Sequence, residues 1–173
     1  LNKINIKKII FDPVMVSTSG AKLVNNSCIN YIKKNMIKKV SIITPNIPEA
    51  QILSGMIINS RDEMIQASKK ILKLGAKNVL IKGGHLKSKY IEDILVSKKS
   101  IKIFRNKRII TSNTHGTGCT LSSAIATFYS CGKNLKKSCF HAINYVNHAI
   151  KTAPNFGKGN GPLNHLNNIK NKI

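Results

Sequence analysis

Short apolar runs alternate with longer segments of helical periodicity, and this alternation constrains the fold more than any other feature of the chain. Runs rich in β-branched residues predict strands in five places: Ile9–Phe11, Ser41–Thr44, Asn78–Ile81, Ile91–Val96 and Ile101–Ile110. Such alternation is typical of α/β proteins, in which helices cover both faces of a mainly parallel sheet. A short turn of lysines and serines separates the last two strands, so we expect those two to pair antiparallel.

Helices are predicted between and after these strands. Ser60 and Glu63 have the spacing of a capping box, and Gly75 follows the apolar stripe that begins there. Another helix is expected over residues 27–40, where apolar residues recur on one face. Asn134 is expected to cap the last helix.

The positive charge of the chain is large, because 29 lysines and arginines face 6 acidic residues and give a formal net charge of +23. A charge of this size suggests binding to nucleic acid or to anionic lipid. Only three of the basic residues are arginines, however, and aromatic residues make up 5% with no tryptophan. The planar groups that grip and stack on nucleotides are therefore scarce, and nucleic acid is not the expected partner.

The chain has no run of the roughly eighteen apolar residues that a membrane span needs. Lysines interleave with isoleucines from the start, unlike the charged segment and apolar block of a signal peptide. The four cysteines form no CxxC pair and no metal-ligand spacing with histidines, as expected of reduced thiols in the cytoplasm. We expect a cytoplasmic protein of one domain. Because the chain enters an apolar run directly after Leu1, we expect it to be a piece of a longer one.

A glycine-rich loop, Gly116-Thr117-Gly118, immediately precedes an amphipathic helix. The amides of such a turn can converge at the positive end of the helix dipole and bind an anion. With a phosphoryl group bound, these donors would stabilise the charge on the transferred oxygens. The alternative is a glycine turn that only starts a helix, and the spacing leaves both open. The chain contains neither GxxxxGKS nor GxxxxGKT, which excludes a Walker loop.

Cys119 follows this loop in the first turn of the predicted helix. The helix dipole favours a thiolate at this position, and a thiolate could accept a proton from an alcohol. The alternative is a small buried apolar residue, which most free cysteines are. The position of Cys119 favours a function, whereas Cys28, Cys131 and Cys139 are expected to be small buried apolar residues.

Charged residues follow three of the predicted strands. Asp12 and Glu49 are two of only six acidic residues, and both come just after the carboxyl end of a strand, where open parallel sheets bind their ligands. Carboxylate oxygens at this edge suit the Mg²⁺ of a nucleotide. The alternatives are a turn former before Pro13 for Asp12 and a favourable helix-start charge for Glu49. Lys82, which precedes Gly83-Gly84, could reach phosphates.

Taken together, these residues resemble the hydroxymethylpyrimidine and phosphomethylpyrimidine kinases of thiamine biosynthesis, which have the ribokinase-like fold. Five motifs carry the resemblance in the family's order: FDPVMVSTSGAKL at Phe11–Leu23, ITPNIPEA at Ile43–Ala50, VLIKGGH at Val79–His85, NTHGTGCTLSSAIA at Asn113–Ala126 and GKGNGPLNH at Gly157–His165. The GTGC sequence matters most, because most ribokinase-like enzymes have an aspartate where this family has cysteine. The resemblance implies a three-layer α/β sandwich, of which residues 1–173 form the C-terminal part of a single kinase domain, incomplete at the N-terminus.

The resemblance also implies an activity. ATP would phosphorylate the hydroxymethyl group of 4-amino-5-hydroxymethyl-2-methylpyrimidine, and a second ATP would convert the monophosphate to the diphosphate. Mg²⁺ is the implied cofactor, and a homodimer is the implied assembly. A pyridoxal kinase of the same fold is the nearest alternative, because related vitamin B6 kinases can share the GTGC loop. An inactive remnant or a basic binding module is the alternative from another class.

On the side of the alcohol, the resemblance implies that Cys119 lies beside the accepting hydroxyl. Gly116, Thr117 and Gly118 would supply the anion hole for the phosphoryl group. Val14 matches a position that lines the pyrimidine pocket.

On the side of the nucleotide, the resemblance implies that Asp12 and Glu49 hold Mg²⁺. Asn46 matches the same metal and phosphate region. Lys82 matches a lysine that contacts the nucleotide phosphates, and Thr114 matches a further contact to the nucleotide.

Overall fold

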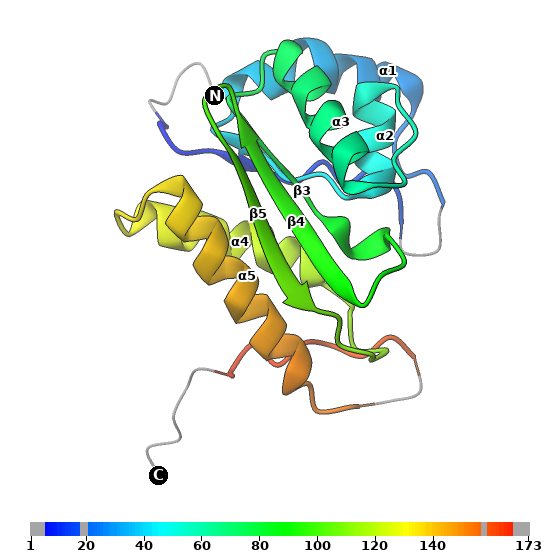
Figure 1. Ribbon diagram of the computed structural model, residues 1–173, viewed down its shortest axis with the longest axis vertical. Helices are drawn as coiled ribbons and strands as arrows, with labels where there is room; N and C mark the ends of the chain where they lie inside the picture. Colours follow the sequence, from blue (N-terminus) through cyan, green and yellow to red (C-terminus); the bar gives the residue numbers. More distant parts are fainter. Residues whose placement is uncertain (1–5, 18–20, 157–158, 168–173) are drawn as a thin grey trace. The chain divides into compact units, whose positions relative to one another are not determined.

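The computed structural model (Figure 1) describes three stretches of the chain: residues 6–17, 21–156 and 159–167. The chain forms two compact units, Leu1–Lys107 and Arg108–Ile173. The assignment of residues 1–173 to a single domain stays a prediction. Parts of two predicted motifs, Thr18–Gly20 and Gly157–Lys158, lie outside the described residues. No helix in the described stretches is long and apolar enough to cross a bilayer.

The first unit contains a five-stranded sheet in which the strands lie side by side in chain order: β1 (Ile10–Phe11), β2 (Ile42–Ile43), β3 (Asn78–Ile81), β4 (Tyr90–Ser97) and β5 (Ile101–Lys107). The first three strands run parallel, whereas β4 is antiparallel to β3 and β5 is antiparallel to β4. The α/β class is confirmed, with a mixed rather than a mainly parallel sheet among the described strands. The reason is loop length, because residues 82–89 and 98–100 are too few for the crossover that parallel neighbours need.

Three α-helices lie in the described part of the first unit: α1 (Asn26–Tyr31), α2 (Ile47–Ser54) and α3 (Arg61–Lys73). The helix predicted over residues 27–40 changes type after α1, first to a π-helix and then to a 3₁₀-helix. In the π-helical part, the amide of Ile37 donates to the carbonyl oxygen of Ile32, five residues earlier. This wider turn brings both buried isoleucines toward one face, which a regular α-helix would not do.

The helix caps differ in one detail from the prediction. The Ser60 hydroxyl accepts the Glu63 amide at 3.2 Å as expected, and the Glu63 carboxylate accepts the amide of Asn59, one residue before the cap, at 2.6 Å. The complete capping box lies at α2, where Asn46 Oδ1 accepts the Glu49 amide at 2.9 Å. In return, Glu49 Oε2 accepts the Asn46 amide at 2.8 Å. These reciprocal bonds satisfy two amides that the helix start leaves without partners.

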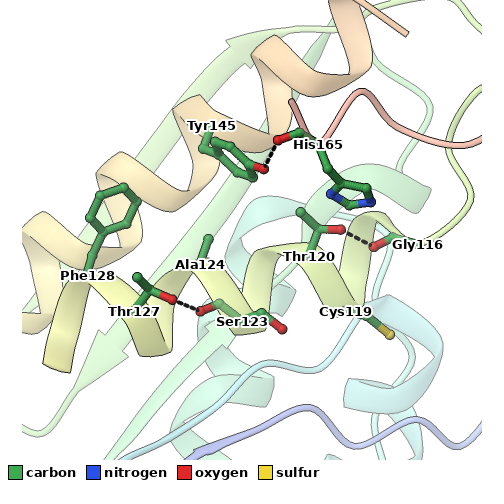
Figure 2. Close-up of a pocket in the computed structure, with 9 residues that line it drawn as sticks. All are labelled: Gly116, Cys119, Thr120, Ser123, Ala124, Thr127, Phe128, Tyr145 and His165. Carbon is green, nitrogen blue, oxygen red and sulfur yellow. Dashed lines mark hydrogen bonds between the residues drawn. The ribbon is translucent and has the colours of Figure 1, made fainter. Parts of the chain in front are cut away.

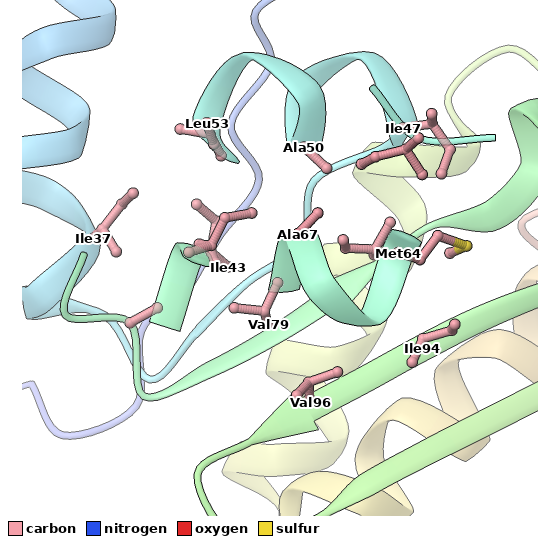
Figure 3. Packing of buried hydrophobic residues seen from close by; sticks show 14 of the residues in the cluster. Ile37, Ile43, Ile47, Ala50, Leu53, Met64, Ala67, Val79, Ile94 and Val96 are labelled. Atoms are coloured by element: carbon pink, nitrogen blue, oxygen red, sulfur yellow. The ribbon is translucent and has the colours of Figure 1, made fainter. Parts of the chain in front are cut away.

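One face of the sheet carries the main hydrophobic cluster of the first unit (Figure 3). The strands contribute β-branched side chains to it: Ile43, Val79, Ile81, Ile94 and Val96. From the helices come Leu53, Met64 and Ala67, among others. Leu80 lies between two of these strand residues and points to the opposite face, yet it is fully buried as well. The central strand β3 is therefore buried on both faces, as its continuous apolar run indicates.

The second unit contains α4 (Thr117–Ser130) and α5 (Leu135–Lys151), which pack against each other. Gly132 makes the turn between them with a φ of 86°, a left-handed conformation that glycine adopts without strain. Asn134 Oδ1 accepts the Lys137 amide at 2.9 Å, so the predicted cap of the last helix is confirmed.

Candidate functional site

In the first unit, polar side chains follow each of the three parallel strands. Asp12 follows β1, Asn46 follows β2 and Lys82 follows β3. Lys82 Nζ donates to Asp12 Oδ1 at 2.7 Å, and Thr44 Oγ1 donates to the same oxygen at 2.9 Å. The side chains of Lys82 and Asp12 are only 16% and 12% exposed. The structure thus brings together two residues whose strand-end positions suggested a common site.

Glu49 is almost completely buried, at 2% exposure. Its Oε2 accepts the Asn46 amide in the capping box, and its Oε1 accepts the Met15 amide at 3.4 Å. Burial raises the pKa of Glu49, although the hydrogen bond from Asn46 and the charge of Lys82 oppose the rise. Glu49 therefore joins the start of α2 to the segment that follows β1, and its role as a metal ligand stays a prediction.

Asp93 is a buried carboxylate that the sequence pattern did not single out. It lies in β4 at 9% exposure, and its Oδ1 accepts the Gly83 amide at 2.9 Å. Burial raises the pKa of Asp93 to about 6, while the Gly83 hydrogen bond and the charge of Lys82 act in the opposite direction. One signal was available in the sequence, namely an acidic pair inside the otherwise apolar run IEDILV.

Three of the six acidic side chains therefore act on a single ammonium group, that of Lys82. Asp12 pairs with it directly, and Glu49 and Asp93 interact with it through their charges. Such a concentration of acids is unexpected in a chain with a net charge of +23. It marks this edge of the sheet as the place where the first unit concentrates its negative charge.

Asp12 is better suited than Glu49 to a magnesium ion carried by a nucleotide. Asp12 Oδ2 makes no hydrogen bond to the described part of the chain, and Oδ1 already attracts a cation, Lys82. Both oxygens of Glu49, in contrast, already accept main-chain amides. No group of three or more His, Cys, Asp or Glu side chains suited to a metal occurs among the described residues. An ion here would take most of its ligands from phosphate and water.

In the second unit, the glycine-rich loop forms the start of α4. Gly116 is the N-cap of α4 and has a φ of 83°, in the left-handed region that favours glycine. Its carbonyl oxygen accepts both the amide and the hydroxyl of Thr120, at 2.9 and 2.8 Å. These two bonds fix the loop on the first turn of the helix.

The amides that remain available differ slightly from those expected. The Thr117 amide donates to the Thr114 carbonyl oxygen at 3.3 Å. The amides of Gly118 and Cys119 donate to no other described residue. Two adjacent N–H groups at the positive end of α4 are therefore free to bind an anion. The side chain of Cys119 is exposed rather than buried in the core, as the functional interpretation requires. Cys139 is buried as predicted, but Cys28 and Cys131 are exposed too, so the prediction of buried apolar cysteines is wrong for those two.

A groove of about 550 Å³ extends along α4 from this loop (Figure 2). It is lined by small, polar and aromatic residues: Gly116, Cys119, Thr120, Ser123, Ala124, Thr127, Phe128, Tyr145 and His165. The Tyr145 hydroxyl donates to the His165 carbonyl oxygen at 2.8 Å, which ties α5 to the C-terminal segment. Figure 2 shows the Cys119 sulfur at the rim of the groove, pointing away from Tyr145 and His165.

A hydrogen bond between two asparagines lies beside the loop, and the sequence pattern gave no indication of it. Asn113 is buried, and its side-chain amide donates to Asn155 Oδ1. The loop also pairs with the C-terminal segment, since the His115 amide donates to the Gly161 carbonyl oxygen at 3.3 Å and His115 forms a bridge with Pro162. A Cβ atom at Gly161 would collide with the Asn113 side chain. The C-terminal segment around Gly161 and Pro162 thus packs against the start of the glycine-rich loop, although it lies far along the chain.

The remaining predicted site residues are accessible. Val14 is 48% exposed, and its amide donates to the Asp12 carbonyl oxygen at 3.0 Å. Thr114 is exposed too, and its main chain forms part of the loop. Their contacts with the pyrimidine and the nucleotide stay predictions.

Comparison with known proteins decides the family to which these motifs belong. The model of the phosphomethylpyrimidine kinase family matches residues 1–164. The chain belongs to the phosphomethylpyrimidine kinase family. The resemblance carried by the five motifs is thereby confirmed.

Two curated members show how much of the family's length this chain spans. It is 44% identical over 151 residues to the hydroxymethylpyrimidine/phosphomethylpyrimidine kinase of Aquifex aeolicus, a match that covers 87% of this chain and 59% of that kinase. It is 40% identical over 160 residues to the thiamine biosynthesis bifunctional protein ThiED of Geobacter sulfurreducens, covering 92% of this chain and 33% of that protein. The chain therefore spans less than two thirds of either relative.

Two solved structures confirm the ribokinase-like fold of this phosphomethylpyrimidine kinase family member. The pyridoxal kinase of Staphylococcus aureus in complex with AMP-PCP matches with a TM-score of 0.89 and 29% identity, over 99% of this chain and 62% of that one. The phosphomethylpyrimidine kinase of Clostridium difficile 630 matches with a TM-score of 0.75 and 38% identity, over 87% of this chain and 60% of that one.

The Gly161→Ala variant of this family member should lose stability, because the added methyl group would collide with the Asn113 side chain beneath the anion loop. We expect a decrease of about 1–3 kcal/mol in the free energy of unfolding, measured by urea denaturation. Gly159→Ala is the matched control, since a Cβ atom there meets nothing within 4 Å. Equal stability of the two variants would contradict the proposed packing of the C-terminal segment against the loop.

Asp93→Asn should change how stability depends on pH. The pKa of Asp93 in the folded protein, about 6, lies above the ordinary value of 3.8, so its stabilising contribution is complete below pH 3.8 and is lost as pH rises through 6. Asparagine does not titrate. The free energy of unfolding of the variant minus that of the wild type should therefore increase by about 2 kcal/mol from about pH 4 to pH 7.

Urea denaturation at a series of pH values measures this difference. Glu92→Gln is the control of opposite sign, because the hydrogen bond from Arg61 lowers the pKa of Glu92. The stabilising contribution of Glu92 is thus present at neutral pH and is lost as pH falls through its lowered pKa. A pH-independent difference between wild type and Asp93→Asn would show that Asp93 does not titrate as a buried carboxyl group.

Proposed function

We propose that this protein transfers a phosphoryl group from ATP to the hydroxymethyl group of 4-amino-5-hydroxymethyl-2-methylpyrimidine, and a second one to the resulting monophosphate, in thiamine diphosphate biosynthesis. Membership of the phosphomethylpyrimidine kinase family supports the class of reaction. The structural observation that carries the proposal is the pair of available amides, those of Gly118 and Cys119, next to an exposed thiol.

In the proposed reaction, the hydroxyl oxygen of the alcohol attacks the γ-phosphorus of ATP. A new oxygen–phosphorus bond forms, the bond from the γ-phosphorus to the β–γ bridging oxygen breaks, and ADP leaves. The amides of Gly118 and Cys119 stabilise the charge on the transferred oxygens. Gly116 and Thr117 shape the loop that presents these amides. The thiolate of Cys119 accepts the proton of the alcohol.

The groove along α4 suits the remainder of the nucleotide. It begins at the anion loop and continues past Ala124, Phe128 and Tyr145, whose apolar and aromatic surfaces can contact a flat base. The sulfur of Cys119 points away from Tyr145. An alcohol beside Cys119 and a nucleotide in the groove would therefore approach the phosphoryl group from different sides, as an in-line transfer requires.

Residues of the first unit have the chemistry for binding phosphate and metal. We assign Lys82 and Asn46 to the nucleotide phosphates, and Asp12 with Glu49 to Mg²⁺, which would neutralise phosphate charge when bound. Lys82 would then exchange the carboxylate of Asp12 for phosphate. Thr114 and Val14 are assigned by resemblance, to the nucleotide and to the pyrimidine. We place the enzyme in the cytoplasm, as a homodimer.

One observation favours a second candidate, a pyridoxal kinase. The Staphylococcus aureus pyridoxal kinase matches this chain with a TM-score of 0.89, above the 0.75 of the Clostridium difficile phosphomethylpyrimidine kinase. The curated relatives at 40% and 44% identity, however, are the thiamine biosynthesis protein ThiED and a hydroxymethylpyrimidine/phosphomethylpyrimidine kinase. Sequence therefore favours the pyrimidine, while backbone similarity is compatible with either alcohol.

A direct assay separates these candidates. The protein is incubated with ATP, Mg²⁺ and either the pyrimidine alcohol or pyridoxal, and phosphorylated products are identified by mass spectrometry. We expect mono- and diphosphorylated pyrimidine, with pyridoxal phosphorylated more slowly. Phosphorylation of pyridoxal alone would overturn the thiamine assignment, and no turnover of either alcohol would indicate an inactive protein or a binding module.

Replacement of Cys119 tests the proton transfer. Cys119→Ser should lower kcat about 100-fold, because a serine hydroxyl is a far weaker base near neutral pH. Cys119→Asp should retain more activity, since a carboxylate can accept the proton. Cys131→Ser is the matched control, as Cys131 is also an exposed cysteine, at the other end of α4. Unchanged rates for both Cys119 variants would exclude proton transfer by this residue.

A further inference from the structure

We propose that Asp93 is a positioning residue, which fixes the turn after β3 through its hydrogen bond to Gly83 and attracts the ammonium group of Lys82 through its charge, and so directs Lys82 toward the nucleotide phosphates. The proposal deepens the proposed kinase function, on which it rests for the identity of the ligand. Asp93 itself lies inside the sheet, and it acts on the nucleotide through Gly83 and Lys82.

The hydrogen bond to Gly83 is the first step of the argument. Gly83 directly follows Lys82, and its amide donates to Asp93 Oδ1 at 2.9 Å in a buried position. A Cβ atom at Gly83 would collide with the carbonyl oxygen of Glu92. The turn therefore lies directly on the main chain of β4, and the carboxylate of Asp93 holds its first residue, Gly83, there.

The other side of Lys82 is also held by the main chain. The Lys82 amide donates to the Pro45 carbonyl oxygen at 2.9 Å, and Lys82 forms a bridge with Asn46. Lys82 is thus held between the end of β2 on one side and Asp93 of β4 on the other. The main chain of Lys82 is therefore held on both sides. From this position its ammonium group lies 2.7 Å from Asp12 Oδ1. The direction of the lysine follows from these attachments.

The charge of Asp93 requires a separate explanation, because an asparagine could accept the same amide without the cost of burying a charge. Lys82 is the charged side chain that acts on Asp93 within the described residues. From β5, the residue opposite Asp93 is the apolar Phe104. The adjacent Glu92 pairs instead with Arg61 of α3 and Arg105 of β5. The charge of Asp93 is therefore directed at Lys82.

The test compares Asp93→Asn with Glu92→Gln in the intact protein. Both variants remove one carboxylate from β4, but only Asp93→Asn removes a carboxylate whose charge acts on Lys82. We expect Asp93→Asn to lower kcat/KM for ATP about tenfold while the KM for the alcohol stays unchanged, and Glu92→Gln to leave both near the wild-type values. In a Lys82→Met background, Asp93→Asn should have no further effect, because its influence passes through Lys82.

A purely structural role for Asp93 would give a different result. In that case, Asp93→Asn would change the KM values for ATP and for the alcohol together, or would lower the melting temperature in step with activity. Alternatively, its full effect on kcat/KM would add to that of Lys82→Met. Each of these outcomes overturns the proposal, as does a kcat/KM for ATP within twofold of the wild type.

A second measurement is independent of turnover. In the ¹H–¹⁵N spectrum, the Gly83 amide resonance of the wild type and of Glu92→Gln should shift with a midpoint near pH 6, and that of Asp93→Asn should not shift with that midpoint. A Gly83 resonance that has the same position in Asp93→Asn as in the wild type at every pH would overturn the contact between Asp93 and Gly83 on which the positioning role rests. Absence of turnover from the wild type, with this titration present, would instead overturn the proposed kinase function and leave the attachment of the turn to Asp93 in place.

Discussion

The ion pair between Lys82 and Asp12 is the interaction on which the edge of the sheet in the first unit depends. Both side chains are largely shielded from water, so each charge needs the other. Glu49 and Asp93 add negative charge around the same ammonium, and burial raises the pKa of both. Three carboxylates around one lysine give this edge an excess of negative charge. A magnesium ion carried by a nucleotide would offset that excess, which is consistent with a site for a metal–phosphate group.

The elements of the fold could be predicted because local sequence determines them. The buried strand β3 and the capped helix α3 carry their own signals, and both occur where those signals predict them. The π-helical turn after α1 could not be predicted in this way, because no local sequence signal calls for it. It occurs where Ile32 and Ile37 are both buried, and that burial depends on the rest of the first unit. The mixed sheet follows from loop lengths, which the sequence does contain.

The site was only partly predictable, for a related reason. Asp12 and Lys82 were found because strand ends in a parallel sheet share one edge, a rule that needs no knowledge of distant contacts. The position of Glu49 was compatible with a metal ligand and with a helix-start charge, and its bonds to Asn46 and Met15 depend on where the segment after β1 lies. Asp93 meets Gly83 only because a short loop returns the chain beside β3. Such long-range contacts leave little trace in a single sequence.

This chain is similar both to a pyridoxal kinase and to a phosphomethylpyrimidine kinase, and the physical reason lies in which part of the substrates its residues can contact. A pyridoxal kinase and a phosphomethylpyrimidine kinase both align with most of this chain, although they are named for different alcohols. The shared chemistry is the transfer of a phosphoryl group, and here the amides of Gly118 and Cys119 and the ammonium of Lys82 are suited to phosphate. Selectivity between two ring systems requires contacts to the rings themselves, which a backbone match does not measure. Val14, exposed beside Asp12, is the predicted contact of that kind, and such a contact would make the choice of alcohol depend on different residues from those proposed to hold the nucleotide.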